Sequence, residues 1–236
     1  IVTVMDAKNG EILASATNPS YNPNSLPGDM SYQNPLVSYT YEPGSVMKIY
    51  TYMCALETGK YDGSKEYKSG EYKVDDETVI HDWNDIGWGY VSYDTGFAYS
   101  SNVAIINIIN EYLSNEQLKS CLTQFGFGNK TGIELSGEEV GTIKFKYDSE
   151  TYTAGFGQGI TTTAIQQLQA LSVVANDGVM IKPHIISKIV NKKTKEEQVV
   201  EIEKTEQLVS SSTTDKIKDL MEDVLDPQAT GSKYYI

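Results

Sequence analysis

The 236-residue sequence contains no arginine, so its basic side chains are lysines and two histidines. Its 19 lysines are outnumbered by 32 acidic residues, and the formal net charge is −13. Nucleic acids and anionic membrane surfaces both bind clustered positive charge. The composition therefore argues against either of them as a direct partner of this chain.

Cysteine and histidine are also scarce. The two cysteines, Cys54 and Cys121, are too few for a disulfide framework or a cysteine metal site. Free cysteine is among the most buried residue types, so we expect both to be small buried thiols. The two histidines, His81 and His184, lie far apart and lack the spacing of metal ligands. We therefore expect no metal site.

Long apolar segments are missing as well. No run approaches the roughly 20 residues that a membrane span needs, and no signal peptide opens the chain. The chain starts within an apolar, β-branched run at residues 1–5 and stops abruptly at residue 236. We therefore expect residues 1–236 to be one domain, truncated at both ends, of a longer protein whose anchor lies outside them.

Hydrophobic periodicity predicts a mixed order of strands and helices. Apolar runs at residues 1–5 and 11–16 flank Asn9-Gly10, a strong signal for a β-hairpin. Proline-rich residues 18–44 and polar residues 60–92 are expected to be irregular, with a short hairpin in the second stretch. The expected helices are 45–56, 102–113, 116–125, 163–176 and 213–225, and the expected later strands are 184–190 and 197–202. This order indicates a single α+β domain whose sheet is completed by distant segments.

A possible nucleophile and its base stand at the start of the first helix. Pro43-Gly44 interrupts the chain, so Ser45 falls in the first helical turn, where free N–H groups favour developing negative charge. Lys48 follows one turn later on the same face. A serine nucleophile needs a base, and a lysine amine with a lowered pKa can be that base. By spacing alone, a capping serine with a solvated lysine is the more common explanation.

A second polar group begins the apolar helix at residues 102–113. Ser100 and Asn102 flank one residue, so both side chains can point the same way from a short turn. The hydroxyl can relay a proton, and the amide can accept from Lys48 and donate to a substrate carbonyl. An ordinary N-cap at Ser101 or Asn102 explains the same residues and is compatible with the functional interpretation.

Together these motifs resemble the transpeptidase domain of class B penicillin-binding proteins. That family carries Ser-x-x-Lys, then Ser-x-Asn, then Lys-Thr/Ser-Gly, and the resemblance runs nearly end to end. Six segments are similar to the family in the family's own order. They are residues 4–14, 41–45, 81–83, 125–128 with 131–135, 157–160, and 175–178 with 182–184.

The third family motif is expected to lie outside this chain. Lys130-Thr131-Gly132 spells it, but its surroundings match a different family segment, so we interpret it as a coincidence. Residues 229–235 are similar to the stretch that precedes the motif. We therefore expect an incomplete sheet and a chain that is inactive or nearly so on its own, because one missing oxyanion donor costs about 100- to 1000-fold in rate.

The resemblance implies a D,D-transpeptidase, a serine acyltransferase that cross-links peptidoglycan stem peptides and is the target of β-lactams. It implies no cofactor and gives six residues a role. Ser45 would be the acylated nucleophile, Lys48 its base, Ser100 a proton relay, and Asn102 the group that holds Lys48 and the substrate amide, with Trp83 and Tyr99 at the rim of the cleft. Simple packing explains Trp83 and Tyr99 equally well.

The resemblance also implies a fold and a setting. The fold would be an α/β sandwich, with a central antiparallel sheet flanked by helices and an all-helical part that carries Ser100. The catalytic domain would be extracytoplasmic at the bacterial plasma membrane, with stem peptides, β-lactams and other cell-wall synthesis proteins as partners. Three alternatives stay open: a D,D-carboxypeptidase, a β-lactam sensor or β-lactamase, and a non-catalytic scaffold of the cell-wall machinery. The Glu-x-x-Leu-Asn-like loop of class A β-lactamases is not found in the sequence.

Overall fold

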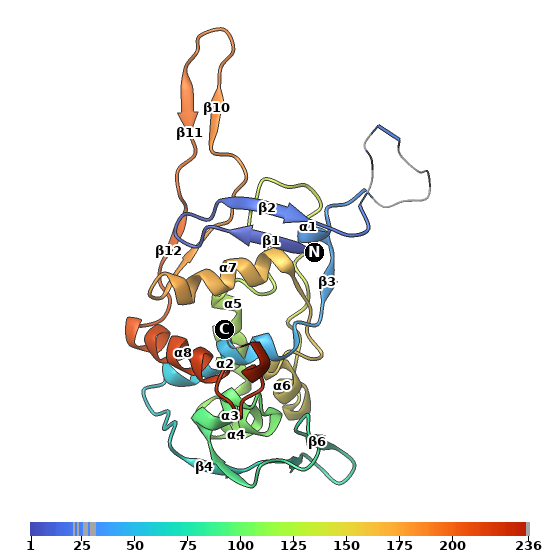
Figure 1. Ribbon diagram of the computed structural model, residues 1–236, viewed down its shortest axis with the longest axis vertical. Helices are drawn as coiled ribbons and strands as arrows, with labels where there is room; N and C mark the ends of the chain where they lie inside the picture. Colours follow the sequence, from blue (N-terminus) through green and yellow to red (C-terminus); the bar gives the residue numbers. More distant parts are fainter. Residues whose placement is uncertain (21, 23, 26–27, 29–31, 235–236) are drawn as a thin grey trace.

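The computed structural model describes residues 1–20, 22, 24–25, 28 and 32–234. Helices and strands are mixed along these residues (Figure 1), which confirms the predicted α+β class. The helices are α1 (Pro35–Ser38), α2 (Met47–Leu56), α3 (Tyr93–Ala98), α4 (Asn102–Tyr112), α5 (Asn115–Gln124), α6 (Asp148–Gly155), α7 (Ala164–Ala175) and α8 (Ser211–Asp223), with 3₁₀ turns η1 (Gly44–Val46) and η2 (Ser232–Tyr234). The strands are β1 (Val2–Met5), β2 (Ile12–Ala16), β3 (Thr40–Tyr41), β4 (Glu66–Lys68), β5 (Glu71–Lys73), β6 (Val79–His81), β7 (Tyr90–Ser92), β8 (Thr162–Thr163), β9 (Val179–Ile181), β10 (Lys188–Val190), β11 (Glu197–Val199) and β12 (Lys204–Gln207).

The segments with clear periodicity fold as predicted, and most of their observed ends lie within a few residues of the predicted ends. Helices α2, α4, α5, α7 and α8 correspond to the five expected helices, and β1, β2, β10 and β11 to the expected strands. Side-chain caps explain two of the helix starts. Ser101 accepts from the Ala104 N–H at 2.9 Å, and Thr163 forms a capping box with Gln166.

Three short helices were not predicted. Asn34 caps α1 and Pro35 suits its first turn, so this helix forms inside the stretch expected to be irregular. The α3 and α6 helices span only six and eight residues, too few for a clear periodic signal. Residues 21, 23, 26–27 and 29–31 of the irregular stretch lie outside the described residues.

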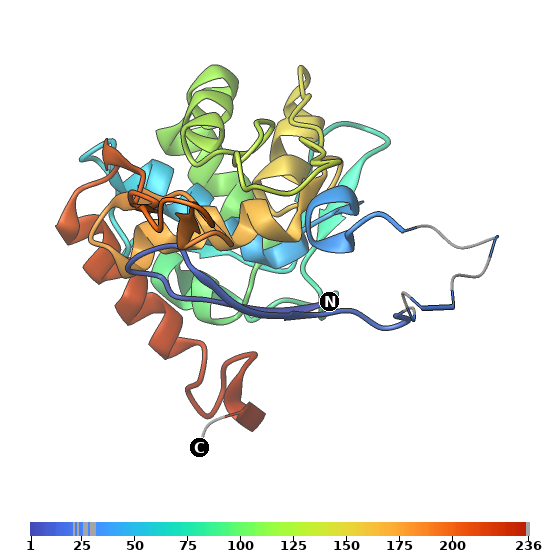
Figure 2. The same ribbon diagram turned by 90° about the horizontal axis from the view of Figure 1, so that it is seen from above.

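Helix α2 lies at the centre of the domain. Its Met47, Tyr50, Tyr52 and Met53 are fully buried, and α4, α5, α6 and α8 pack around it (Figures 1 and 2). Close packing of such large side chains leaves little freedom for the helix to shift. The N-terminal end of α2, which follows Ser45, is therefore held by the core.

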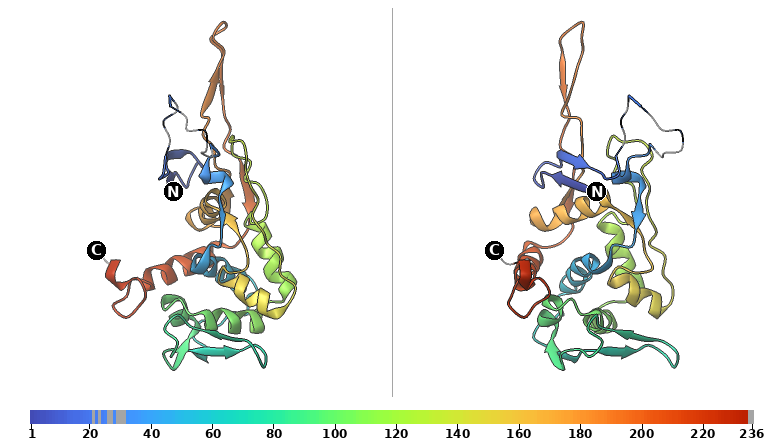
Figure 3. Two further views of the ribbon diagram at one scale, coloured as in Figure 1. Left: turned by 90° about the vertical axis from the view of Figure 1, so that its right-hand side faces the viewer. Right: turned by 45° about the vertical axis from the view of Figure 1, so that its right-hand side comes forward.

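The strands form six separate two-stranded sheets, and all six pairs are antiparallel. The described residues therefore do not form the single central sheet that the resemblance implies. β1 and β2 lie beside α7, and the Asn176 amide just after α7 donates to the Ala7 carbonyl between these strands. β10 and β11 form a hairpin that projects from the body of the domain (Figure 3).

The expectation that both cysteines are free thiols is wrong. Cys54 on α2 and Cys121 on α5 form a disulfide, with their Cα atoms 6.1 Å apart. The two helices are neighbours in the core, which brings together residues that are 67 positions apart in the sequence. Sequence spacing could not show this bond, because helix packing creates it rather than a local cysteine motif.

Removing the disulfide is expected to destabilise the domain strongly. A cross-link over a loop this long restricts the unfolded chain and contributes about 4 kcal/mol in the loop-entropy account. Replacing both cysteines by alanine should lower the free energy of urea-induced unfolding by about that amount. The wild-type chain treated with a reducing agent is the matched control and should show a similar loss. An unchanged unfolding midpoint in the double variant would contradict this prediction.

Candidate active site

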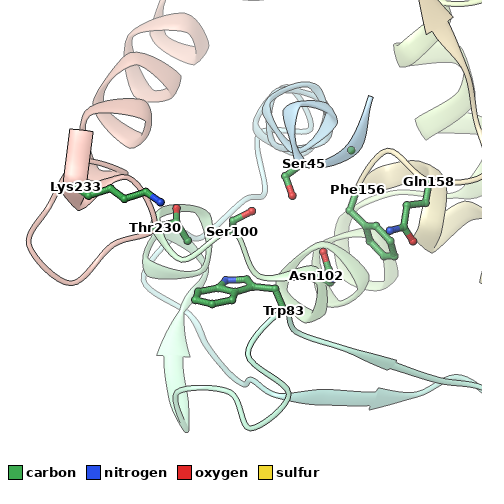
Figure 4. Close-up of a pocket in the computed structure, with 9 residues that line it drawn as sticks. Ser45, Trp83, Ser100, Asn102, Phe156, Gln158, Thr230 and Lys233 are labelled. Atoms are coloured by element: carbon green, nitrogen blue, oxygen red, sulfur yellow. The ribbon is translucent and has the colours of Figure 1, made fainter. Parts of the chain in front are cut away.

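A cleft of about 570 Å³ lies where the turn before α2 faces the start of α4 (Figure 4). It brings together four of the six predicted site residues, namely Ser45, Trp83, Ser100 and Asn102. These come from three segments distant in the sequence, so the fold alone places them side by side. The complete lining is Gly44, Ser45, Trp83, Ser100, Asn102, Phe156, Gln158, Thr230 and Lys233.

Ser45 stands in η1, directly N-terminal to α2. The sequence predicted the first turn of the helix itself, and the structure has a tighter 3₁₀ turn there. The residue is exposed, and Figure 4 shows its hydroxyl directed into the cleft. Because the N-terminal end of a helix carries free N–H groups, negative charge that develops beside Ser45 is stabilised.

The glycine-rich segment 157–159 braces the turn that carries Ser45. The Gly44 N–H donates to the Gly157 carbonyl at 3.0 Å, and the Gly159 N–H donates to Glu42 Oε1 at 2.9 Å. Gly157 has a φ of +85°, and a Cβ atom there would lie 2.0 Å from the Gly44 carbonyl oxygen. Glycine is therefore required at position 157 for this close approach of the two backbones.

Gly157→Ala is expected to displace the Ser45 turn. A displacement of about 1 Å at a reacting group can cost about 100-fold in rate, so acylation by a penicillin should slow by at least that factor. The matched control is Gly137→Ala, where φ is +76° but a Cβ atom would meet nothing within 4 Å. Mass-spectrometric acylation rates distinguish the two, and equal rates would show that the brace does not position Ser45.

Lys48 is on α2, one turn after Ser45, and only 3% of its surface is exposed. Its Nζ donates to the Ser100 carbonyl and to Ser100 Oγ, the latter at 3.1 Å. Burial lowers the pKa of Lys48 to about 7, and the nearby Asp82 opposes part of this shift. A substantial fraction of the amine is therefore unprotonated at neutral pH and able to accept a proton.

Ser100 occupies the turn between α3 and α4 in a left-handed conformation, with a φ of 53°. Residues other than glycine rarely adopt this conformation, and it persists where surrounding contacts hold it. The Ser100 N–H donates to the Phe97 carbonyl at 2.9 Å, and the Ser101 N–H to the Gly96 carbonyl at 2.8 Å. These bonds help to keep the Ser100 carbonyl and hydroxyl within reach of Lys48.

Asn102 lines the cleft at the first position of α4, and Figure 4 shows its side chain directed into the cleft. Its Nδ2 donates to the His81 carbonyl at 3.0 Å. In the described structure the Lys48 amine donates to Ser100 instead. The predicted contact between Asn102 and Lys48 is thus replaced by separate bonds, and the Asn102 amide remains beside the cleft.

The two predicted rim residues lie differently. Trp83 is 63% exposed and lines the cleft, and its Nε1 donates to the Tyr99 carbonyl at 2.9 Å. The Tyr99 ring packs on Trp88, with ring centroids 4.9 Å apart. Tyr99 is not among the lining residues of this cleft, so its link to the rim is the hydrogen bond that its carbonyl accepts from Trp83.

The Lys130-Thr131-Gly132 segment also lies outside the cleft lining. Thr131 is buried, and its N–H and hydroxyl both donate to Glu138 at 2.6 Å. Lys130 is exposed. The segment therefore forms a local turn with Glu138, and its match to the Lys-Thr/Ser-Gly motif does not place it in the candidate active site.

Four cleft residues were missed by sequence reasoning. Gln158 lies within the segment 157–160 and Phe156 directly precedes it, and the similarity of this segment to the family was the only available signal for them. Thr230 and Lys233 follow α8, and the Thr230 N–H and hydroxyl donate to the Ala98 carbonyl at 3.2 and 3.0 Å. These bonds bring the segment after α8 to the cleft, a long-range contact that spacing in the sequence could not indicate.

The described part of the chain offers neither a metal cluster nor a membrane helix. No group of three or more His, Cys, Asp or Glu side chains among the described residues is placed to hold a metal ion. None of the helices described here combines the length and the apolar character that a membrane crossing requires.

The arrangement is suited to one class of chemistry. An exposed serine precedes a helix, and a buried, partly neutral lysine one turn further on donates to a second serine that lines the same cleft. This is the arrangement of enzymes that transfer acyl groups through a serine and use lysine as the base.

Comparison with known proteins defines the family. The family model of the penicillin binding protein transpeptidase domain matches residues 1–235. The chain therefore belongs to the family of penicillin-binding protein transpeptidase domains, as its motifs predicted.

Relatives share this domain over most of the chain. Stage V sporulation protein D of Bacillus subtilis is 34% identical over 248 residues, covering 100% of this chain and 38% of that protein. Peptidoglycan D,D-transpeptidase MrdA of Acinetobacter baumannii is 28% identical over 213 residues, 78% of this chain and 32% of MrdA. The structure of penicillin binding protein 3 of Mycobacterium tuberculosis complexed with ampicillin matches with a TM-score of 0.86 and 28% identity, over 99% of this chain and 54% of that one. The chain spans about a third of the length of these two curated relatives.

Proposed function

We propose that this domain carries the acylation site of a D,D-transpeptidase that cross-links peptidoglycan stem peptides. The observation that carries the proposal is the placement of Lys48. The residue is 3% exposed, and its amine has a pKa lowered to about 7 and bonds to Ser100 in the cleft that Ser45 lines. The similarity to MrdA, a peptidoglycan D,D-transpeptidase, supports the choice of substrate.

In the proposed reaction the neutral Lys48 amine removes the Ser45 proton, directly or through the Ser100 hydroxyl. Ser45 Oγ attacks the carbonyl carbon of the penultimate D-alanine of a stem peptide. The peptide bond to the terminal D-alanine breaks, and the proton held by Lys48 passes to the departing amine. An amine of a neighbouring stem peptide then attacks the acyl-Ser45 ester, which forms the cross-link and restores the Ser45 hydroxyl.

Asn102 and Trp83 act on the substrate in this proposal. The Asn102 side chain is directed into the cleft and its Nδ2 is engaged by His81, so its amide oxygen can accept from a substrate N–H. Trp83 offers an exposed aromatic surface at the rim. Tyr99 supports Trp83 through its carbonyl and is a positioning residue.

β-Lactams acylate Ser45 in the same way, because their strained amide occupies the place of the substrate amide. The relative from Mycobacterium tuberculosis has been solved in complex with ampicillin and with aztreonam, and this supports β-lactam binding here. The proposed setting is extracytoplasmic. The disulfide between Cys54 and Cys121 supports it, because disulfides persist in oxidising compartments and are rare in the cytoplasm.

The test is intact mass spectrometry after incubation with benzylpenicillin. A form extended to the length of the relatives' domain should carry one adduct per chain, and tryptic mapping should place it on Ser45 within the peptide that ends at Lys48. Residues 1–236 alone should be labelled much more slowly, because a missing oxyanion donor costs about 100- to 1000-fold in rate. An unlabelled extended form, or an adduct on another residue, would overturn the proposal. Incubation with a D-Ala-D-Ala peptide and an amine then separates cross-linking from hydrolysis by a carboxypeptidase.

A further inference from the structure

Three consecutive residues, 81–83, each bond to the turn that carries Ser100. The His81 carbonyl accepts from Asn102 Nδ2 at 3.0 Å, and Trp83 Nε1 donates to the Tyr99 carbonyl at 2.9 Å. Between them, Asp82 Oδ1 accepts from Ser101 Oγ at 2.8 Å and from the Val103 N–H at 3.1 Å. The segment thus holds the turn from both sides of Ser100, as the nearby placement of Trp83, Ser100 and Asn102 in Figure 4 indicates.

Asp82 is the central member of this segment and is 1% exposed. Its second carboxylate oxygen, Oδ2, accepts from the Gly70 N–H at 2.8 Å, and its own N–H donates to the Gly70 carbonyl at 2.8 Å. A buried carboxylate is costly unless hydrogen bonds satisfy it. Three donors satisfy the Asp82 carboxylate. Through them this side chain, which follows β6, binds both the segment before β5 and the start of α4.

We propose that Asp82 is a positioning residue of the acylation site, which holds the Ser100 turn in its left-handed conformation and presents a fixed negative charge to Lys48. The proposal rests on the proposed function, because it assigns the turn and Lys48 to acylation. Asp82 is not among the residues that line the cleft, so its effect is exerted through Ser101, Val103 and Lys48.

Burial and the charge of Asp82 shift the pKa of Lys48 in opposite directions. Burial of its amine lowers the pKa of Lys48, and the charge of Asp82 raises that pKa. Tyr67 also faces Asp82, and burial raises the pKa of the Tyr67 phenol, so this group stays neutral at physiological pH. Without the Asp82 charge, the effect of burial on the Lys48 pKa is no longer opposed. The titration midpoint of the Lys48 amine should therefore fall below the wild-type value.

The experiment compares Asp82→Asn with Ser101→Ala. Asparagine keeps the size of the side chain but removes the charge and turns an NH₂ group toward one of the three donors. Ser101→Ala removes the hydrogen bond to Asp82 and keeps the charge. Two quantities are read: the rate of acylation by benzylpenicillin, and the titration midpoint of Lys48 from the 13Cε shift of labelled lysine, assigned with Lys48→Met.

Both variants should slow acylation by about 10- to 100-fold, because the turn loses its fixed position. Only Asp82→Asn should lower the Lys48 midpoint, whereas Ser101→Ala should keep it near the wild-type value of about 7. Ser101→Thr, which retains the hydroxyl, should restore most of the rate. A role limited to structural support would slow acylation without moving the midpoint.

Equal Lys48 midpoints in wild type and Asp82→Asn would overturn the assignment of the charge. A Ser101→Ala variant that is acylated at the wild-type rate would overturn the claim that the bond to Asp82 positions the turn. This outcome can be observed even if Asp82→Asn does not fold. The midpoint is measured without any acylation. A failure of the proposed function, seen as no Ser45 adduct in the wild-type protein, is therefore distinguishable from a failure of this inference.

Discussion

Replacing Ser45 by alanine is expected to abolish the covalent penicillin adduct completely. Among the described residues of the cleft, Ser45 is the serine that stands before a buried helix with free N–H groups, and it lies one turn from Lys48. Without its Oγ no ester can form, so the loss should be total rather than partial. Intact mass spectrometry at saturating penicillin measures it as the fraction of chains that carry the adduct.

The variant should fold normally, which makes this result easy to interpret. Ser45 is exposed, and exposed positions change the free energy of unfolding by less than about 0.5 kcal/mol. The matched control is Ser136→Ala, an exposed serine outside the cleft, which should form the adduct as the wild type does. Residual labelling of Ser45→Ala at the wild-type rate would mean that another residue is the nucleophile.

The part of the site that the sequence predicts is local. Ser45 and Lys48 lie within one helical turn, and Ser100 and Asn102 flank a helix start, so spacing and capping rules suffice to propose them. The fold brings Ser45, Ser100 and Asn102 together in one cleft and Lys48 to Ser100. Only the resemblance to a family predicted that these residues share one site, because no sequence pattern connects residue 45 with residue 100.

Long-range contacts account for what the sequence did not reveal. Cys54 and Cys121 are joined by the packing of α2 on α5, and Thr230 reaches the cleft through bonds to Ala98. Asp82 belongs to the family-like segment 81–83, but it is one acidic residue among 32, and its three buried donors are what indicate its role. Such residues depend on tertiary neighbours, which hydrophobic period and turn chemistry do not encode.

Lys48→Met is the second prediction with a very large expected effect. Methionine fills a similar volume in the core but cannot accept a proton, so acylation of Ser45 should slow by about 1000-fold, within the range for loss of a general base. The adduct should still form slowly on Ser45, which separates loss of the base from loss of the nucleophile. The matched control is Lys130→Met, an exposed lysine outside the cleft, whose acylation rate should equal that of the wild type.

The pH dependence gives this prediction its second measurement. In the wild type the acylation rate should rise with pH up to about 7 and then level off, because the unprotonated amine is the base. The pKa of Lys48 in the folded chain lies below 10.5, the ordinary value of a lysine amine, so between about pH 7 and 10.5 the unfolded chain binds a proton that the folded chain does not. Stability of the wild type should therefore increase with pH across that window, and Lys48→Met should lose this increase. The free energy of urea-induced unfolding at pH 6, 7.5 and 9 measures this increase. If it depends on pH in the same way in the wild type and in Lys48→Met, Lys48 is not held in a buried, neutral state.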